Sequence, residues 1–203
     1  FLRLLDGLPL ALAQAASYIR EMECSVAKYI STYTSQWEQL MKKNAQAGSG
    51  PIDYEQRSIW TTWTISFKAI QSTDGNAANL LRLWAFVDNQ DFWHGLLGAG
   101  ANNQTHWPSW LRMMACDEME FSAVMGLLLR YSMVDSRGSG YGTYSIHPVV
   151  HRWTAASQNA MERTDSLRFA VLLVGLLAPD HHDSDYWVLQ RRLLPHAERC
   201  SWG

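Results

Sequence analysis

The 203-residue chain has few of the features that assign a sequence to a specialised class of protein. Its three cysteines, Cys24, Cys116 and Cys200, lie far apart, which argues against a disulfide framework and is typical of a reducing compartment. The formal net charge of −2 lacks the positive excess expected of a protein that binds nucleic acid or an anionic membrane. The longest apolar run, Phe169 to Ala178, is too short to cross a bilayer and indicates a core helix.

Two further signals are missing, one for catalysis and one for export. No Gly-x-x-x-x-Gly-Lys-Ser/Thr phosphate loop occurs, nor an apolar strand that ends in paired acidic residues for magnesium. We therefore expect no catalytic residues and no ATP hydrolysis here. The first residues lack the basic region, apolar core and cleavage site of a secretory signal. Because the chain begins at Phe1, within or just before a helix, we expect a cytoplasmic fragment of a longer protein.

Helical patterns dominate what is present, and 47% of the residues are hydrophobic, enough for one or two small domains with buried cores. Pro9 fits the first position of one helix and Ser25 fits the N-cap of the next. The stretch from Lys42 to Pro51 is polar and rich in glycine, and it predicts a linker. Apolar residues at helical spacing predict helices over residues 9–21, 26–41, 58–71, 80–87, 89–97, 117–129, 165–177 and 187–200, with another starting at 148. Pro195 is expected to interrupt the last of them.

The pattern changes between residues 131 and 146 to short runs that favour β-strands. Tyr131–Val134 and Thr143–Ile146 predict two strands, and Asp135–Gly142 between them predicts a hairpin tip. Three helices followed by a hairpin are the order of a winged helix, a relative of the helix-turn-helix. We therefore expect a mainly α fold with one small β-hairpin.

The stretch from Tyr144 to Trp153 predicts a strand that runs directly into a helix, with His147 at the junction. Backbone N–H groups at a helix start attract anions, so His147 is suited to holding a phosphate and equally to capping the helix. His147 and His151, four residues apart, offer a zinc pair, but the zincin pattern needs a Glu where Pro148 stands. His181–Asp185 also contains metal-ligand types and predicts a solvated polar loop, so we expect no metal site.

Four segments, in order along the chain, carry a family resemblance. Gly7–Leu12 reads GLPLAL, Ser58–Trp63 reads SIWTTW, Tyr144–His151 reads YSIHPVVH and Arg191–Ala197 reads RRLLPHA. They resemble the GLPLAL motif, the opening of the winged helix, the counterpart of the MHD motif and the entry to tetratricopeptide repeats. These motifs belong to fungal members of the NB-ARC family, which are STAND-type, NLR-like NTPases.

The resemblance implies three parts and two nucleotide-contacting residues. The parts are a helical, ARC1-like subdomain over residues 1–50, a winged-helix, ARC2-like domain over 55–158, and a helical linker and start of a repeat region over 160–203. In that family the proline of the first motif packs near the adenine, and the motif histidine contacts the β-phosphate of bound ADP. By resemblance, Pro9 and His147 take these roles.

Pro148 departs from the plant and animal members of the family, which have Asp at this place. The change removes a side chain that caps a helix, although Pro148 suits the first helical turn. The resemblance implies that ADP or ATP binds only in the full-length protein, whose phosphate loop would lie upstream of Phe1. This stretch would bind no cofactor by itself and would not be an enzyme.

The function implied is that of a regulatory lid in a nucleotide-dependent switch, of the kind that acts in fungal innate immunity and heterokaryon incompatibility. Its partners would be the upstream nucleotide-binding domain, the downstream repeats and proteins that bind them, with no nucleic acid and no membrane. A protein-interaction scaffold without a working nucleotide site is an alternative. A DNA-binding winged helix is less favoured, because Asp117, Glu118 and Glu120 open its predicted recognition helix and would repel phosphates.

Overall fold

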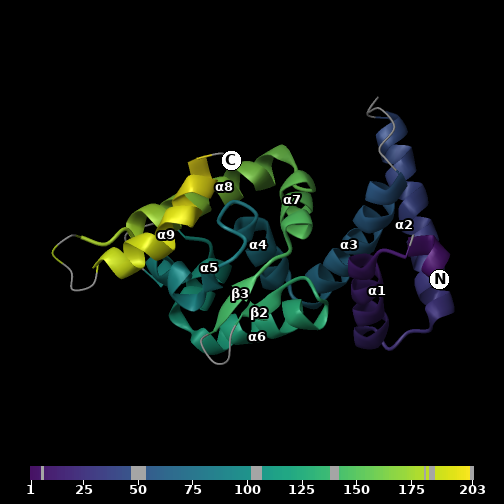
Figure 1. Ribbon diagram of the computed structural model, residues 1–203, viewed down its shortest axis with the longest axis horizontal. Helices are drawn as coiled ribbons and strands as arrows, with labels where there is room; N and C mark the ends of the chain where they lie inside the picture. Colours follow the sequence, from purple (N-terminus) through teal and green to yellow (C-terminus); the bar gives the residue numbers. More distant parts are fainter. Residues whose placement is uncertain are drawn as a thin grey trace. The chain divides into compact units, whose positions relative to one another are not determined.

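The computed structural model describes residues 1–5, 7–46, 54–101, 107–137, 142–180, 182 and 186–201. These residues are mainly α-helical with a small three-stranded antiparallel sheet, which confirms the expected fold class (Figure 1). They form two compact units, each described by itself: Phe1–Thr73 with Arg130–Met133 (unit 1), and Asp74–Leu129 with Val134–Gly203 (unit 2). Within the described ranges, no helix is long and apolar enough to cross a membrane.

Unit 1 is built from helices that follow one another closely in sequence. They are the 3-10 helix η1 (Leu2–Leu5), α1 (Pro9–Glu21), α2 (Val26–Gln46) and α3 (Tyr54–Thr73). Pro9 occupies the first turn of α1, and the Ser25 hydroxyl accepts a hydrogen bond from the Lys28 N–H at 3.1 Å, as the sequence predicts. The predicted linker is wrong for Lys42–Gln46, where good helix formers extend α2, and residues 47–51 lie outside the described part.

The core of unit 1 is aromatic. Tyr29 and Tyr33 of α2 are almost fully buried against Ala11 and Ala15 of α1 and Ile65 of α3. Burial raises the pKa of the Tyr29 phenol to about 12. The packing thus groups α3 with α1 and α2, while the subdomain boundaries expected near residues 50–55 and 158–160 stay predictions.

Unit 2 contains the sheet and the remaining helices. Its elements are α4 (Gly75–Trp84), β1 (Phe92–Trp93), the 3-10 helix η2 (His94–Ala101), α5 (Ser109–Cys116), α6 (Glu118–Arg130, of which Arg130 belongs to unit 1), β2 (Asp135–Arg137), β3 (Thr143–Ser145), α7 (Pro148–Ala156), α8 (Ala160–Leu176) and α9 (Tyr186–Ser201). In Figure 1, α9 is drawn in yellow alongside α8, and the two helices contact each other.

The sheet places β3 between its two partners. Tyr144 lies opposite Phe92 of β1 and opposite Ser136 of β2, and both pairs are antiparallel. The helices α4 and α6 precede the β2–β3 hairpin, as the sequence predicts. The helix α5 and the strand β1 are elements that the sequence pattern does not predict. Phe92 packs on Trp84 at a ring distance of 4.2 Å, so β1 anchors the sheet to α4.

Three predicted elements of this region are wrong. Asp135–Arg137, predicted as part of the hairpin tip, forms the strand β2 because it pairs with β3. Tyr131–Val134 does not form a strand, because Ser132 has a φ of 52° that turns the backbone, and the side chains of Tyr131, Met133 and Val134 are buried. Residues 89–97 do not begin as a helix, because Phe92 and Trp93 pair with β3 and only the following residues coil into η2.

The last two helices also differ from the predicted ones. α8 begins at Ala160 rather than at Asp165, since Asn159 and Glu162 form a reciprocal capping box. α9 runs through Pro195 without a break. Pro195 has no N–H, so the Arg191 carbonyl lacks its helical donor. Arg191 and Pro195 are both exposed, so water can donate a hydrogen bond to this carbonyl instead.

Candidate functional site

Pro9 lies at the start of α1, next to motif residues that have local structural roles. Gly7 has a φ of +67°, which a residue with a side chain adopts only with strain, and this turn leads from η1 into α1. Leu8 packs against the core of unit 1 and Ala11 is fully buried within it. The Pro9 ring is exposed and so remains available to a ligand.

His147 is the N-cap of α7 and is exposed. Its Nδ1 accepts a hydrogen bond from the backbone N–H of Val149 at 3.3 Å. An Nδ1 that accepts leaves the proton of the neutral ring on Nε2. No described residue accepts from this Nε2–H, so it can donate to a ligand in solution.

The start of α7 has fewer free backbone donors than the sequence analysis assumed. Pro148 has no N–H, and the Val149 N–H is taken by the His147 ring. The His151 N–H donates to the His147 carbonyl at 3.0 Å. An anion at this junction would therefore depend on the imidazole more than on the helix terminus.

Asn89 fixes the backbone just before His147. Its carbonyl accepts from the Ile146 N–H at 2.8 Å, and its side-chain Nδ2 donates to the Ile146 carbonyl at 2.9 Å. Ile146 itself is almost fully buried. The chain thus enters α7 along a fixed course, although the sequence gives no sign that Asn89 does this.

His151 anchors α7 from the inside. Its buried Nε2 lies 2.9 Å from the Trp84 carbonyl and 3.0 Å from the Val87 carbonyl, and since carbonyls only accept, Nε2 carries the proton. Burial lowers the pKa of His151 below its ordinary value of 6.5. A histidine committed to two backbone carbonyls does not form a zinc pair with the exposed His147.

His196 of α9 performs a similar task on the same segment. Its Nδ1 accepts from the Asp88 N–H at 3.2 Å, and its Nε2 lies 2.9 Å from the Asp91 carbonyl. The side chain is fully buried, and burial lowers its pKa as well. His196 stands within the stretch that resembles the entry to repeats, and the sequence analysis did not assign it a role.

The two candidate residues belong to different units, Pro9 to unit 1 and His147 to unit 2, and each is described alone. Neither lines any of the cavities described in this structure. In the described part of the chain, no group of three or more His, Cys, Asp or Glu residues is arranged to hold a metal ion. Of the loop at 181–185, only His182 lies within the described residues.

Comparison of this chain with known protein families, with curated proteins and with solved structures found no match. The family resemblance of the four sequence motifs therefore stays a prediction.

Proposed function

We propose that this chain is the regulatory lid of a nucleotide-dependent, STAND-type switch, and that His147 responds to the phosphates of bound ADP. The observation that carries the proposal is the exposed Nε2–H of His147, held at the start of a helix and without an acceptor among the described residues. A hydrogen bond from such a donor to a phosphate oxygen is charge-assisted and strong.

The surroundings of His147 support this role because they keep the ring in one place. Asn89 holds the backbone before it, and His151 holds the helix after it. Val150 and Trp153, on the inner face of α7, are buried. A sensor carried on a rigid element loses little freedom when it binds, so its contact energy is available to favour one nucleotide state.

The remaining parts of the proposal rest on the resemblance. Pro9 would pack near the adenine, and the phosphate loop would precede Phe1 in a longer, cytoplasmic protein. The partners would be that nucleotide-binding domain, the downstream repeats and the proteins that bind them. This stretch would then control nucleotide exchange without catalysing hydrolysis.

The test is ADP affinity of the full-length protein and of two variants of His147. His147→Ala removes both the cap and the Nε2 donor, whereas His147→Asn restores a capping side chain and lacks the imidazole. We expect both variants to bind ADP about tenfold or more weakly, the cost of losing a hydrogen bond to a charged group. His182→Ala, another exposed histidine, is the control and should bind as the unaltered protein does.

Two results would count against the proposal. Unchanged ADP affinity in both variants would show that His147 does not contact the nucleotide. Weaker binding in His147→Ala that His147→Asn restores would assign His147 to helix capping alone. The transcript sequence upstream of Phe1 provides a separate check, because a switch of this type requires a phosphate loop there.

The second candidate function is a protein-interaction scaffold, and the outer surface of α9 favours it. Trp187 is 53% exposed and Leu194 is 56% exposed. They lie about two helical turns apart on α9, with Arg191 about one turn from each. Exposed large apolar side chains on one helix are typical of surfaces that bind another protein. A complete gene product that lacks an upstream phosphate loop and binds no ADP would favour this function.

The DNA-binding alternative finds no support in α6. Asp117, Glu118 and Glu120 are all exposed at the start of this helix, where a recognition helix would meet phosphates. Their negative charges would repel DNA. Salt-dependent binding of the chain to duplex DNA would contradict this conclusion.

A further inference from the structure

A cavity of about 370 Å³ opens in unit 2 where β1, α6 and β3 meet. This volume falls in the range of about 300–1,000 Å³ that is usual for small-molecule sites. Half of the lining residues carry aromatic rings, and the others include one serine and one carboxylate. The side chains that matter here are those of Trp93, His94, Glu118, Phe121, Ser122 and Tyr144.

The rings around the cavity are set at steep angles to one another. The Tyr144 ring lies 5.9 Å from that of Phe121 at an interplanar angle of 70°, and the His94 ring lies 5.3 Å from Phe121 at 46°. Phe121 is almost fully buried, whereas Tyr144 and His94 are half-buried. An aromatic ring that presents its face to a cavity attracts a cation there, because that face is the negative part of the ring.

Glu118 is the only acidic side chain that lines the cavity among the described residues, and no lysine or arginine side chain lines it there. The one imidazole of the lining, that of His94, has its Nε2 2.9 Å from the Met114 carbonyl. Glu118 is exposed in the first turn of α6, and no salt bridge of Glu118 is found in the described part of the chain. Asp117 and Glu120, next to it in sequence, are also exposed. The charge at this site therefore complements a cation.

Trp93 already binds one cation within the protein. The Arg192 guanidinium carbon lies 3.6 Å from the centroid of the Trp93 ring, and Arg192 donates to both carboxylate oxygens of Asp91 at 2.6 and 2.8 Å. A Cβ placed on Gly95 would lie 2.6 Å from the Trp93 Nε1, so the glycine allows the indole its position. The ring is thus fixed where it borders the cavity.

We propose that this cavity binds an alkylated ammonium group, of a free small molecule or of a methylated lysine side chain. Aromatic faces attract such a cation, and its low demand for hydrogen bonds suits a lining with few acceptors. Glu118 supplies the opposite charge. The site goes beyond the proposed nucleotide switch, since it uses neither Pro9 nor His147 and holds whether or not ADP binds.

The experiment titrates the protein with choline and follows the indole N–H resonance of Trp93 by NMR. A parallel titration uses 3,3-dimethylbutan-1-ol, which has the shape of choline without its charge. We expect choline to bind saturably, and we expect the neutral alcohol to bind at least about fivefold more weakly than choline. A peptide that carries trimethyllysine, compared with choline, shows which of the two sources the site prefers.

Two pairs of variants locate the site. Glu118→Gln should weaken choline binding about threefold, whereas Glu120→Gln, on the same helix but outside the lining, should not change it. Tyr144→Leu should weaken binding about fivefold by removing an aromatic face, and Tyr144→Phe, which keeps the ring, should bind as the unaltered protein does. Glu118 is exposed, so its variant folds even if a Tyr144 variant does not.

Three results would overturn the proposal. The first is the absence of saturable binding of both choline and the trimethyllysine peptide. The second is equal affinity for choline and the neutral alcohol, which would show an apolar cavity without preference for charge. The third is an equal effect of Glu118→Gln and Glu120→Gln, which would place the binding elsewhere on α6.

Discussion

Two short segments without regular secondary structure meet the same requirement in different ways. Residues 85–91 of unit 2 and residues 131–133 of unit 1 both carry backbone polar groups away from helix and strand ladders. Buried groups of this kind need hydrogen-bond partners, and in both segments side chains of neighbouring helices supply them. Unit 2 uses two histidines for this task. Unit 1 uses the Gln14 amide, with a hydroxyl at the Ser132 side chain and a guanidinium at the carbonyl of the preceding Arg130.

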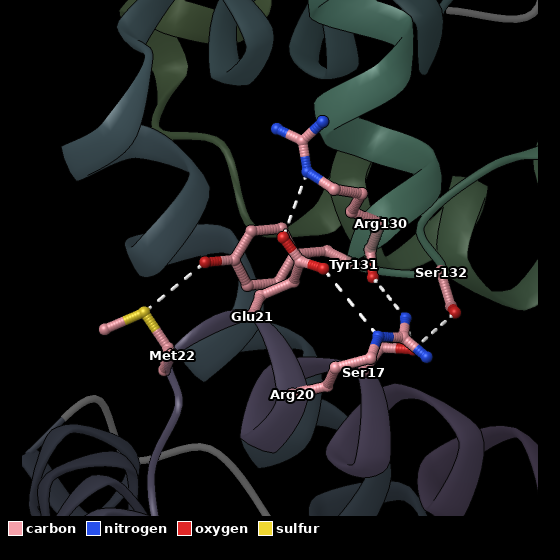
Figure 2. A network of polar contacts seen from close by, with 7 residues as sticks. All are labelled: Ser17, Arg20, Glu21, Met22, Arg130, Tyr131 and Ser132. Atoms are coloured by element: carbon pink, nitrogen blue, oxygen red, sulfur yellow. Dashed lines mark hydrogen bonds and ion pairs between the residues drawn. The ribbon is translucent and has the colours of Figure 1, made fainter.

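In unit 1 the partners come from one face of α1. The fully buried Gln14 donates to the Ser132 carbonyl at 3.0 Å, and the hydroxyls of Ser17 and Ser132 lie 2.7 Å apart. Figure 2 shows Arg20 reaching the Arg130 carbonyl, at 3.2 Å, from the same helix. None of these side chains changes its charge near neutral pH.

In unit 2 the partners are titratable. His151 donates to the Trp84 and Val87 carbonyls, while His196 bridges the Asp88 N–H and the Asp91 carbonyl. The comparison teaches that two segments with equal structural needs differ in their sensitivity to acid, because one is held by histidines whose pKa burial lowers below the ordinary value of 6.5.

The largest expected effect is the loss of the His196 bridge. His196→Ala leaves the Asp88 N–H and the Asp91 carbonyl without these partners and opens a void, so we expect it to destabilise unit 2 by about 3 kcal/mol. Urea unfolding measures this change, and hydrogen exchange at the Asp88 amide locates it. His182→Ala, an exposed histidine, should change stability little. A loss for His196→Ala no larger than that of the control would contradict the bridge.

The second effect is acid sensitivity of unit 2. Burial is the main cause that lowers the pKa of both His151 and His196. For His151, Arg199 lowers the pKa further and Asp88 raises it. For His196, Asp88 and Asp91 raise the pKa and Arg192 lowers it. Between the lowered pKa and 6.5 the unfolded chain binds more protons, so stability is complete above pH 6.5 and falls below it by up to about 1.4 kcal/mol per pH unit for each histidine.

Stability measured from pH 7.5 to pH 5 tests this sign. In His196→Ala, the free energy of unfolding should fall less steeply below pH 6.5, because one titrating histidine is gone. In His182→Ala, this slope should be unchanged. A stability that rises as the pH falls through this range would mean that the two histidines are protonated in the folded state.

The third effect belongs to unit 1 and should not depend on pH. Gln14→Ala removes the donor to the Ser132 carbonyl and should cost about 1.5 kcal/mol. Gln39→Ala, an exposed position on α2, is the matched control. If Gln14→Ala lowers the free energy of unfolding equally at pH 7.5 and pH 5.5, the result supports the difference in acid sensitivity between the two units. If it lowers this free energy only at the lower pH, the result contradicts that difference.

The smallest effect concerns the ion pair drawn in Figure 2 between Glu21 and Arg130, whose atoms are 3.0 Å apart. The Arg130 side chain is 54% exposed, so water and salt screen the pair. Glu21→Gln should cost less than about 0.5 kcal/mol, and that cost should vanish in high salt. A larger, salt-independent loss would show that Glu21 holds residues 131–133 by another contact.

Local patterns predicted much of the helical framework. The start of α1 at Pro9, the cap of α2 at Ser25 and the start of α7 at Pro148 all depend on residues within one turn, and the structure confirms them. The strand predicted at Tyr131–Val134 is wrong because burial decided its conformation, and burial depends on residues distant in sequence.

The candidate residues show the same division. The sequence by itself determined that His147 stands at a strand-to-helix junction and that His151 lies one turn later on the same helix. Only the tertiary structure decided that His147 is exposed, with no acceptor for its Nε2–H among the described residues, while His151 is buried against the Trp84 and Val87 carbonyls. The physical reason is that helical spacing follows from local hydrogen bonds, whereas exposure and long-range partners follow from how α7 packs on α4.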